Sequence, residues 1–395
     1  MNGIIIIGAG ECGVRAAFAL REKGYRGAIT LIGEERTLPY ERPPLSKGVA
    51  VTPKLIRSEA GYADAEIKCF FGVSADRINV DARTIRLADG TILAYDKLLL
   101  ATGARPRLFQ GMEGCATLRS DLDAAAIHSA MRPHAKIGII GGGFIGLELA
   151  AAARKVNADV TVFEAGPRLL NRAVPQEIAG IVRERHIAEG VKIVTNANVP
   201  RADRQTVELS DGSAFTFDMV IAGVGAVPNA ELAEGAGLAV NNGIIVNAAF
   251  LTSDPNIYAA GDCCNFEWHG RRLRLESWKA AQDQGAHVAA AILGMSEPYT
   301  KVPWFWSDQY NLTLQVAGIF DQTRPVQTRA ISDETGIVFQ CDDMGLLTAV
   351  AGIGPDNAVS KDLRILEKLI ERHAVVDPHM LADPSQNLKR LLKAA

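Results

Sequence analysis

Apolar and polar positions follow a fixed order near the start of the chain. The run Gly3–Ile7 is almost wholly apolar and β-branched, which predicts a buried strand. Gly8–Gly13 follows as a glycine-rich turn, and Val14–Lys23 has the pattern of a helix that stops at a glycine. Ala28–Ile32 then predicts a second strand. This stretch is therefore predicted to fold as strand, helix and strand.

The same order returns in the second third of the chain. Lys136–Ile140 predicts a strand and Gly141–Gly146 a glycine-rich turn. A helix is expected to continue through Lys155, and Asp159–Phe163 predicts the next strand. A repeated order of this kind indicates two related units of the strand–helix–strand type.

A second repeat supports an internal duplication. Thr84–Gly90 aligns without gaps to Thr206–Gly212, and each copy ends in Asp-Gly, a turn signal between strand-like runs. Leu98–Leu100 and Val220–Ala222 hold matching places behind these turns. Each copy thus predicts a hairpin that leads into a strand, and each lies behind its own glycine-rich turn.

The C-terminal part has a different pattern. From about Lys301, aromatic residues are followed by alternating apolar positions in Leu312–Val316 and Ile337–Gln340, which predict strands. Leu363–His373 and Asn387–Lys393 predict closing helices. We therefore expect a smaller strand-rich domain here.

Composition narrows the partners and the location. The 395 residues, 48% of them hydrophobic, are enough for several buried cores. The formal net charge is -3, without the basic runs that mark nucleic-acid or anionic-membrane binding. The longest apolar stretch, Ile137–Ala153, is interrupted by glycines and Glu148, which does not suit a membrane span. No secretory leader is recognisable, so we expect a cytoplasmic protein with neither nucleic acid nor membrane as partner.

Both glycine-rich turns have the spacing G-x-G-x-x-G. The first glycine permits a tight turn, the second lets backbone approach a pyrophosphate, and the third lets helix pack on strand. The unpaired N–H groups and dipole of the helix start then favour an anion. An acid about 20 residues further on, which holds a ribose hydroxyl, strengthens the signal: Glu34 or Glu35 after the first motif and Glu164 after the second. The residues expected to bind are Gly8, Gly10 and Gly13 in the first motif and Gly141, Gly143, Ile145 and Gly146 in the second.

Glu164 also bears on the choice of nicotinamide cofactor. A carboxylate at this position accepts from a 2′-hydroxyl and repels a 2′-phosphate, so NADH is preferred over NADPH. Arg168 is the residue that could relax this preference; the alternatives for it are a pyrophosphate contact or a solvated charge.

The segment Thr252–Asp262 predicts an extended stretch that delivers Asp262 at its end. It resembles the flavin-side signature of two-dinucleotide-domain flavoproteins such as glutathione reductase, in which a Gly-Asp pair contacts the ribityl and pyrophosphate part of FAD. A solvated loop aspartate is the alternative. The resemblance assigns the first glycine motif to FAD and leaves the second to NADH. The further residues expected at FAD are Ala101, Thr102, Gly103 and Gly261.

These motifs define the expected fold class. It is an α/β protein with two Rossmann-like dinucleotide-binding domains, for FAD and NAD, plus a smaller α+β C-terminal domain. The expected bounds are 1–107 with 228–300 for the FAD domain, 108–227 for the NADH domain and 301–395 for the C-terminal domain.

The expected electron exit does not use a disulfide. Glutathione reductase and its closest relatives carry a redox-active cysteine pair after the first strand–helix–strand unit, whereas this chain has Pro39–Lys47 there. Its six cysteines show no Cys-x-x-Cys spacing, and its seven histidines are scattered, so we predict no metal site.

The Pro39–Lys47 segment resembles the oxygenase-coupled NADH:ferredoxin reductase family, and the resemblance covers essentially the whole chain. The tail around Gly354–Arg364 is less similar than the rest. The marks that carry the resemblance are RPPLSK at Arg42–Lys47, TLR at Thr117–Arg119, GGGFIGLELAA from Gly141, ESW at Glu276–Trp278, QDQ at Gln282–Gln284 and PWFWSDQ at Pro303–Gln309.

The resemblance implies roles for two charged residues. Lys47 and Glu148 would lie near the flavin–nicotinamide contact as a charge pair that steadies the reduced, anionic flavin. From the sequence alone, Lys47 could instead be a solvated loop lysine. Glu148 could simply complement the dipole of the helix in which it lies early.

The resemblance also implies FAD contacts. Arg42 and Arg119 would neutralise or orient FAD, and Glu276 with Trp278 would border its isoalloxazine ring. Trp306 would cover the flavin near the edge used by an iron–sulfur partner, although a buried core aromatic is the alternative.

The function implied is hydride transfer from NADH to FAD, followed by single electrons to a [2Fe–2S] ferredoxin that serves an oxygenase. We expect a monomer or weak dimer. Two alternatives stay open. One is an NADH-dependent reductase of a small acceptor such as a quinone, a radical or a persulfide, and the other is an NADH-responsive flavoprotein binding module.

Overall fold

The computed structural model describes residues 2–48, 52–295, 297–332 and 334–394. The chain forms two compact units. Unit 1 comprises Met1–Arg42, Pro53–Arg105 and Ala226–Lys301, and unit 2 comprises Pro43–Thr52, Pro106–Gly225 and Val302–Ala395. Among the residues that the structure describes, no helix combines the length and the hydropathy that a membrane span requires.

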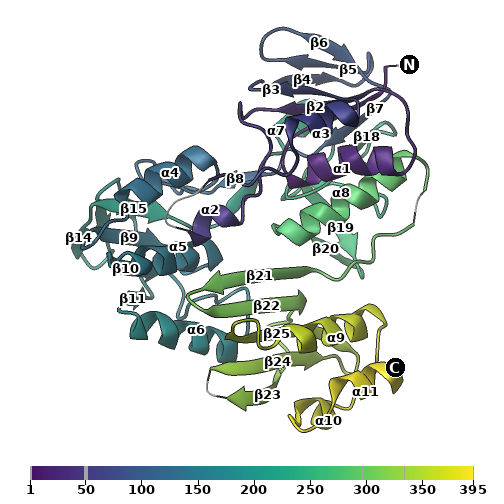
Figure 1. Cartoon of the computed structure of the whole chain (residues 1–395). Coiled ribbons are helices and arrows are strands. Elements are labelled where there is room, and N and C mark those ends of the chain that lie inside the picture. The colour runs from purple at the N-terminus through teal and green to yellow at the C-terminus, as the bar shows by residue number, and fades with distance from the viewer. Residues whose placement is uncertain (1, 49–51, 296, 333, 395) are drawn as a thin grey trace. The chain divides into compact units, whose positions relative to one another are not determined.

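Unit 1 is built on a parallel sheet of strand order β18-β7-β1-β2-β3 (Figure 1). All four residues of β1 are buried, because they lie in the middle of a sheet whose central strands are covered on both faces. The strands are β1 (Ile4–Ile7), β2 (Ile29–Gly33), β3 (Ile67–Phe71), β7 (Lys97–Leu100) and β18 (Ile257–Ala259). The helices are α1 (Glu11–Glu22), α3 (Glu59–Asp64), α7 (Glu231–Gly235) and α8 (Trp278–Ile292).

Unit 2 contains a second parallel sheet, of order β11-β10-β9-β15, which repeats the arrangement around β1. In both sheets the strand before the glycine motif is central, and the strand that follows the motif helix lies beside it. The strands are β9 (Lys136–Ile140), β10 (Asp159–Glu164), β11 (Lys192–Thr195) and β15 (Met219–Ala222), and the helices are α2 (Pro44–Lys47), α4 (Asp121–Ala130), α5 (Phe144–Lys155) and α6 (Gln176–Ala188).

The predicted duplication is confirmed by two small antiparallel sheets. One is β4 (Ala75–Asn79), β5 (Thr84–Leu87) and β6 (Ile92–Ala94), and the other is β12 (Arg201–Ala202), β13 (Thr206–Glu208) and β14 (Ala214–Thr216). Asp96 accepts from the Gly3 amide at 2.9 Å, and Asp218 accepts from the Lys136 amide at 2.8 Å. The same aspartate thus fixes the start of the central strand in each copy. The remaining short strands are β8 (Ala104–Pro106), β16 (Ala226–Pro228), β17 (Ile244–Ile245), β19 (Cys264–Trp268) and β20 (Arg271–Leu273).

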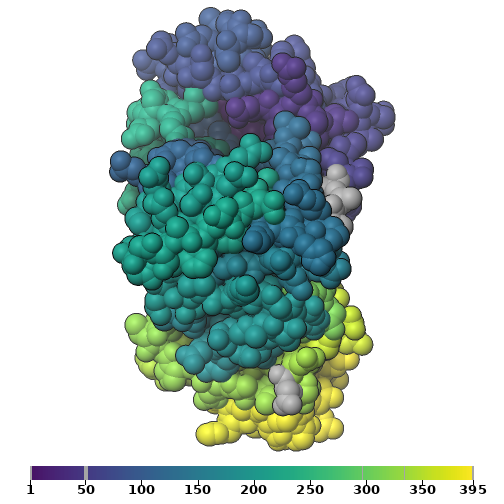
Figure 2. Space-filling model, turned by 90° about the vertical axis from the view of Figure 1, so that its left-hand side faces the viewer, coloured from purple at the N-terminus to yellow at the C-terminus, as the bar shows by residue number. Residues whose placement is uncertain are grey.

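The C-terminal part of unit 2 is an antiparallel sheet of order β21-β22-β25-β24-β23. Alternate residues face opposite cores: Leu314 and Ile353 pack with Val182 of α6, whereas Phe339 and Val350 pack on the other face. The strands are β21 (Trp304–Gln309), β22 (Leu312–Gly318), β23 (Gln327–Ser332), β24 (Thr335–Cys341) and β25 (Leu347–Pro355). The helices are α9 (Ser360–Glu371), α10 (Pro378–Ala382) and α11 (Leu388–Ala394), which are labelled in Figure 1. The C-terminal end of the chain forms the yellow area of the surface in Figure 2.

The expected fold class is confirmed, with one local correction. The prediction that Thr252–Asp262 is extended throughout was wrong, because only Ile257–Ala259 forms a strand. Asp254 Oδ1 accepts from the Asn256 amide at 2.7 Å, and Thr252 Oγ1 accepts from the Asp254 amide at 3.1 Å. These short polar side chains bind their own backbone and make a turn in place of the first half of the strand.

Candidate nucleotide-binding and redox site

Four sequence-predicted segments of unit 1 lie at one edge of its sheet. Gly8 follows β1, Glu34 follows β2, Ala101–Gly103 follows β7 and Gly261–Asp262 follows β18. Because these strands are parallel, their carboxyl ends share an edge, the usual place for a nucleotide in such sheets. The structure therefore brings together residues that are far apart in the sequence.

The three glycines of the first motif serve two purposes. A Cβ on Gly8, whose φ is +111°, would lie 2.0 Å from the Ala101 carbonyl oxygen, and one on Gly13 would lie 1.9 Å from that of Gly8. Apart from Gly10 itself, the N-cap of α1, and its two chain neighbours, no atom of the described residues lies within 4 Å of a Cβ built on Gly10. Gly8 and Gly13 thus allow close packing, while Gly10 leaves space before the α1 amides. This cradle fits the pyrophosphate of FAD.

The two candidate ribose acids differ in their surroundings. The Glu34 side chain is exposed, whereas the Glu35 carboxylate accepts from Tyr40 Oη and from an Arg42 guanidinium nitrogen, both at 2.5 Å. Burial opposes the charge of Arg42, but Glu35, with Tyr40 and Asp262, raises its pKa. Arg42 therefore stays positively charged close to the Gly-Asp pair.

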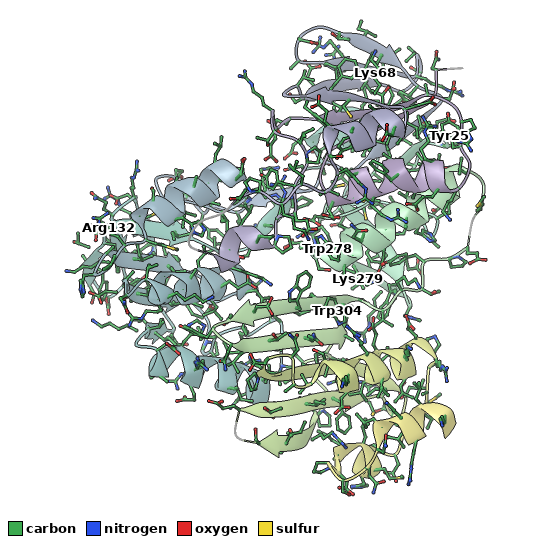
Figure 3. The ribbon with its side chains drawn as sticks, viewed as in Figure 1. Tyr25, Lys68, Arg132, Trp278, Lys279 and Trp304 are labelled. Carbon is green, nitrogen blue, oxygen red and sulfur yellow. The ribbon has the colours of Figure 1, made fainter. Side chains whose placement is uncertain are left out.

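The start of α8 holds the other flavin candidates of unit 1. Ser277 caps α8 by accepting from the Ala280 amide, and Trp278 lies in the first turn (Figure 3). Glu276 is ion-paired with Arg274. Gln284, the last residue of the QDQ mark, is buried, and its side chain accepts a hydrogen bond from the Gly261 amide at 2.7 Å. This bond links α8 to the Gly-Asp pair.

The second glycine motif repeats the first in unit 2. A Cβ on Gly141 would lie 2.3 Å from the Gly223 carbonyl oxygen, and one on Gly146 would lie 2.3 Å from that of Gly141. Apart from Gly143 itself, the N-cap of α5, and its two chain neighbours, no atom of the described residues lies within 4 Å of a Cβ built on Gly143. Ile145, in the first turn, is half exposed. This cradle has the same fit to a pyrophosphate.

Glu164 ends β10 beside this motif. Its two carboxylate oxygens accept from the Gly142 and Gly166 amides, each at 2.7 Å, so the side chain is fixed. Arg168 donates to the carbonyl oxygens of Asn171 at 3.1 Å and Val174 at 3.0 Å. The Arg168 guanidinium therefore stabilises the loop that follows Arg168 in the chain, through hydrogen bonds to its backbone.

Lys47 has a nearer acidic partner than the one the resemblance implied. Its Nζ lies 2.5 Å from Asp308 Oδ2 and 3.9 Å from Glu148 Oε1. Lys47 is the last residue of helix α2, and its side chain is 20% exposed. Its ammonium lies 4.7 Å from the Trp306 ring centroid. One cation is thus shared between two carboxylates and an indole.

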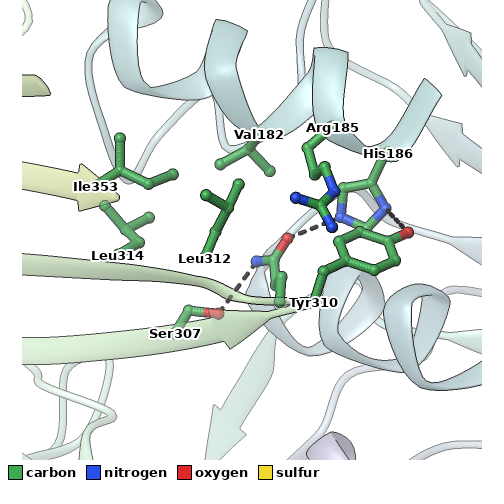
Figure 4. Close-up of a pocket in the computed structure, with 9 residues that line it drawn as sticks. Val182, Arg185, His186, Ser307, Tyr310, Leu312, Leu314 and Ile353 are labelled. Atoms are coloured by element: carbon green, nitrogen blue, oxygen red, sulfur yellow. Dashed lines mark hydrogen bonds between the residues drawn. The ribbon is translucent and has the colours of Figure 1, made fainter. Parts of the chain in front are cut away.

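Glu148 is the end of a buried hydrogen-bond chain, part of which is drawn in Figure 4. Ser307 Oγ donates to Glu148 Oε1 at 2.6 Å, and Gln309 Nε2 donates to Ser307 Oγ at 3.1 Å. Gln309 Oε1 then faces His186 Nε2 at 2.7 Å, and Tyr310 Oη lies 3.1 Å from His186 Nδ1. Since a glutamine carbonyl oxygen can only accept, His186 Nε2 carries the proton. Every donor in the chain therefore points toward the Glu148 carboxylate.

Opposing effects set the charge of this network. Burial raises the pKa of Glu148; Lys47 and hydrogen bonds from Ser307 and Ser46 oppose this, and Asp308 adds to it. Burial lowers the pKa of His186 to about 4, so the imidazole is neutral. Burial of the charged Glu148 carboxylate is thus unfavourable. The charge of Lys47 and the two hydrogen bonds offset only part of this cost.

Sequence reasoning missed six members of this network. Ser46, Ser307, Asp308 and Gln309 lie inside the RPPLSK and PWFWSDQ marks, whereas His186 and Tyr310 lie outside them, and nothing in the spacing says which of them meet. The period-2 alternation of a strand was an available signal, since it places Ser307 with Gln309 and Trp306 with Asp308. Arg119 precedes α4, where its amide donates to Asp123 at 2.9 Å.

None of the cysteines has the properties of a reactive thiol. Burial raises the pKa of Cys69 and Cys341 to about 11, and the other four cysteine pKa values are raised as well, chiefly by burial. Thiols with such values stay protonated near neutral pH and are poor nucleophiles.

The comparisons with known proteins agree with this geometry. Residues 2–285 match the family model of pyridine nucleotide-disulphide oxidoreductases, and residues 304–392 match that of a reductase C-terminal domain. The chain therefore belongs to the pyridine nucleotide-disulphide oxidoreductase family. It is an FAD-dependent oxidoreductase that uses NADH.

The relatives confirm the resemblance found in the sequence. The chain is 38% identical over 406 residues, 98% of each protein, to the anthranilate 1,2-dioxygenase system ferredoxin–NAD(+) reductase component of Burkholderia cepacia. It is 35% identical to putidaredoxin reductase of Pseudomonas putida, over 100% of this chain and 97% of that protein. The crystal structure of a covalent putidaredoxin reductase–putidaredoxin complex matches with a TM-score of 0.94 and 34% identity, over 100% of this chain and 98% of that one.

The first glycine motif yields a prediction about flavin retention. Gly13→Ala should weaken FAD binding by about tenfold or more, because the new methyl group would overlap the Gly8 carbonyl. The ratio of flavin to protein absorbance after purification measures this. Gly61→Ala, in helix α3, is the matched control because its Cβ would meet only ordinary contacts, the nearest at 3.5 Å. Equal flavin content in the two variants would contradict the prediction.

Buried Glu148 yields a prediction about pH. Because its pKa is raised in the folded protein, its stabilising contribution is full below the unfolded pKa and is lost as pH rises through the folded pKa. Glu148→Gln has no such proton to lose. Its unfolding midpoint in urea should exceed that of the wild type at about pH 8, and the difference should shrink toward about pH 4. The exposed Glu184→Gln is the control, and a pH-independent difference for Glu148→Gln would refute this account.

Proposed function

We propose that this protein is an FAD-dependent NADH:ferredoxin reductase that delivers electrons to a [2Fe–2S] ferredoxin serving an oxygenase. The observation that carries the proposal is a combination. The chain has two nucleotide cradles, while the thiols of all its cysteines are held protonated. Electron transfer through a redox-active disulfide is therefore disfavoured, and transfer to a separate one-electron acceptor fits better.

The chemistry that FAD supplies is hydride acceptance from NADH and release of electrons one at a time. The protein's own residues bind and orient the two cofactors. At FAD we propose the first-motif glycines, Ala101–Gly103, Gly261 and Asp262, together with Glu34, Glu35, Arg42, Arg119 and Trp278. At NADH we propose Gly141, Gly143, Ile145, Gly146 and Glu164.

Lys47, Glu148, Glu276 and Trp306 are the proposed catalytic residues. Support comes from unit 2, where Lys47, Glu148 and Trp306 form one network with a fixed geometry. A lysine ammonium held between two carboxylates can balance a negative charge that appears on reduction. The hydrogen-bond chain through Ser307 fixes the Glu148 carboxylate in a single orientation.

NADH is proposed to be strongly preferred over NADPH. The fixed Glu164 carboxylate would repel a 2′-phosphate, and the Arg168 guanidinium is engaged by backbone carbonyls of its own loop. We also propose a cytoplasmic monomer or weak dimer. Its FAD, NADH and C-terminal domains would have the bounds 1–107 with 228–300, 108–227 and 301–395.

The acceptor can be tested directly with the flavin-loaded protein. In anaerobic stopped-flow experiments NADH should bleach the bound flavin, and a [2Fe–2S] ferredoxin such as putidaredoxin should reoxidise it and speed NADH turnover. A quinone and a persulfide, each at the same concentration, are the comparison acceptors. Faster turnover with either small acceptor would overturn the assignment to ferredoxin. Failure of NADH to bleach the flavin would instead point to a binding module.

A second prediction concerns cofactor choice. Glu164→Gln should lower the ratio of kcat/KM for NADH to that for NADPH by about tenfold, because a charge repulsion worth about 1.4 kcal/mol is removed. The exposed Glu184→Gln on α6 is the matched control and should leave the ratio unchanged. An unchanged ratio in Glu164→Gln would mean that this carboxylate does not set the preference.

A further inference from the structure

Asp308 of β21 receives three hydrogen bonds from three different elements of unit 2. Its Oδ1 accepts from Thr313 Oγ1 at 3.0 Å, and Thr313 is its direct partner in the register of β21 and β22. Its Oδ2 accepts from Lys47 Nζ at 2.5 Å and from Trp306 Nε1 at 3.0 Å. The carboxylate is therefore anchored through one oxygen and holds two side chains with the other.

The hydrogen bond to Asp308 limits how the Trp306 indole can turn. The ring also stacks on Trp304, with centroids 5.5 Å apart and planes inclined by 27°. Lys47 Nζ lies 4.7 Å from the ring centroid. Rotation of the ring would break the N–H bond and change both of the other contacts, so the carboxylate selects one indole orientation.

Asp308 also decides which carboxylate neutralises Lys47. The ammonium lies closer to Asp308 than to Glu148, at 2.5 Å against 3.9 Å. The negative charge of Asp308 adds to the raised pKa of Glu148. Loss of this charge would leave Glu148 as the remaining carboxylate beside Lys47 among the ion pairs of the described residues.

We propose that Asp308 is a positioning residue, which holds the Trp306 indole and the Lys47 ammonium in one geometry. The proposal rests on the function proposed above, because that function assigns Lys47 and Trp306 to the reaction. Asp308 itself acts through these two side chains. It couples the charge beside Lys47 to the orientation of the indole.

The first test observes the indole without reference to turnover. In flavin-loaded protein labelled with nitrogen-15 at tryptophan, Trp306→Phe identifies the Nε1–H signal of Trp306. In Asp308→Ala that proton should move upfield, because its hydrogen bond to a carboxylate is gone, and it should exchange faster with solvent. The signals of Trp268 and Trp278, which belong to unit 1, should stay in place, which shows that the variant is folded.

The second test uses kinetics, with Asp308→Asn as an isosteric neutral variant. With a [2Fe–2S] ferredoxin as acceptor, kcat should fall about tenfold, the rate equivalent of one lost charge-assisted hydrogen bond, while KM for NADH changes less than about twofold. The limb of the pH–rate profile that follows the ionisation of Glu148 should move to lower pH, because removal of the negative charge of Asp308 lowers the pKa of Glu148. Asp308→Glu, which keeps the charge, should restore part of the rate.

The matched control is Asp343→Asn, which removes an exposed ion pair with Arg324 in the same unit. An unchanged Trp306 indole signal in Asp308→Ala, or equal effects of Asp308→Asn and Asp343→Asn on kcat, would overturn the proposal. If wild-type protein reduces no ferredoxin, the proposed function fails, yet the indole signal still decides whether Asp308 positions Trp306. If ferredoxin is reduced and the signal does not move, only the positioning role fails.

Discussion

Both nucleotide cradles depend on one constraint, the approach of a strand-end carbonyl to a glycine that has no side chain. A methyl group on Gly8 or Gly141 would lie 2.0 or 2.3 Å from the carbonyl oxygen of the neighbouring strand end, and both glycines have a positive φ. Only glycine meets the two conditions at once. The approach places the amino end of the motif helix at the sheet edge, where its unpaired amides are placed to bind an anion. Asp96 and Asp218 fix the other end of the same central strands, so each copy holds its central strand at both ends.

The sequence predicted the elements well because their signals are local. The apolar runs of β1 and β9, the glycine turns and the repeat at Thr84 and Thr206 were all placed correctly. The error at Thr252 arose because a turn made by short polar side chains interrupts a run that otherwise has strand character. The position of the binding segments at one edge of each sheet could also be predicted, because the carboxyl ends of neighbouring parallel strands lie at the same edge.

The partners within the hydrogen-bonded network around Lys47 and Glu148 could not be predicted in the same way. Lys47 and Asp308 lie 261 positions apart, and Ser46 and Glu148 lie 102 apart. No periodicity relates residues at such separations; the tertiary fold alone brings them together. The resemblance supplied Lys47 and Glu148 as a pair, whereas the geometry gives Lys47 a closer partner in Asp308. A motif can thus identify the members of a site without showing which of them touch.

The C-terminal sheet is part of this network, because β21 supplies both of its branches. Alternation along the strand sends Ser307 and Gln309 toward buried Glu148, and Trp306 and Asp308 toward Lys47. A slip of one residue would exchange the two sets and leave buried Glu148 without the hydrogen bond from Ser307. The register is secured by burial, since one face of the sheet packs on α6 and the other on the core that includes α9. The apolar packing of this sheet therefore maintains the polar geometry, and the hydrogen bond from Ser307, which offsets part of the cost of burying the Glu148 carboxyl group, forms in only one register.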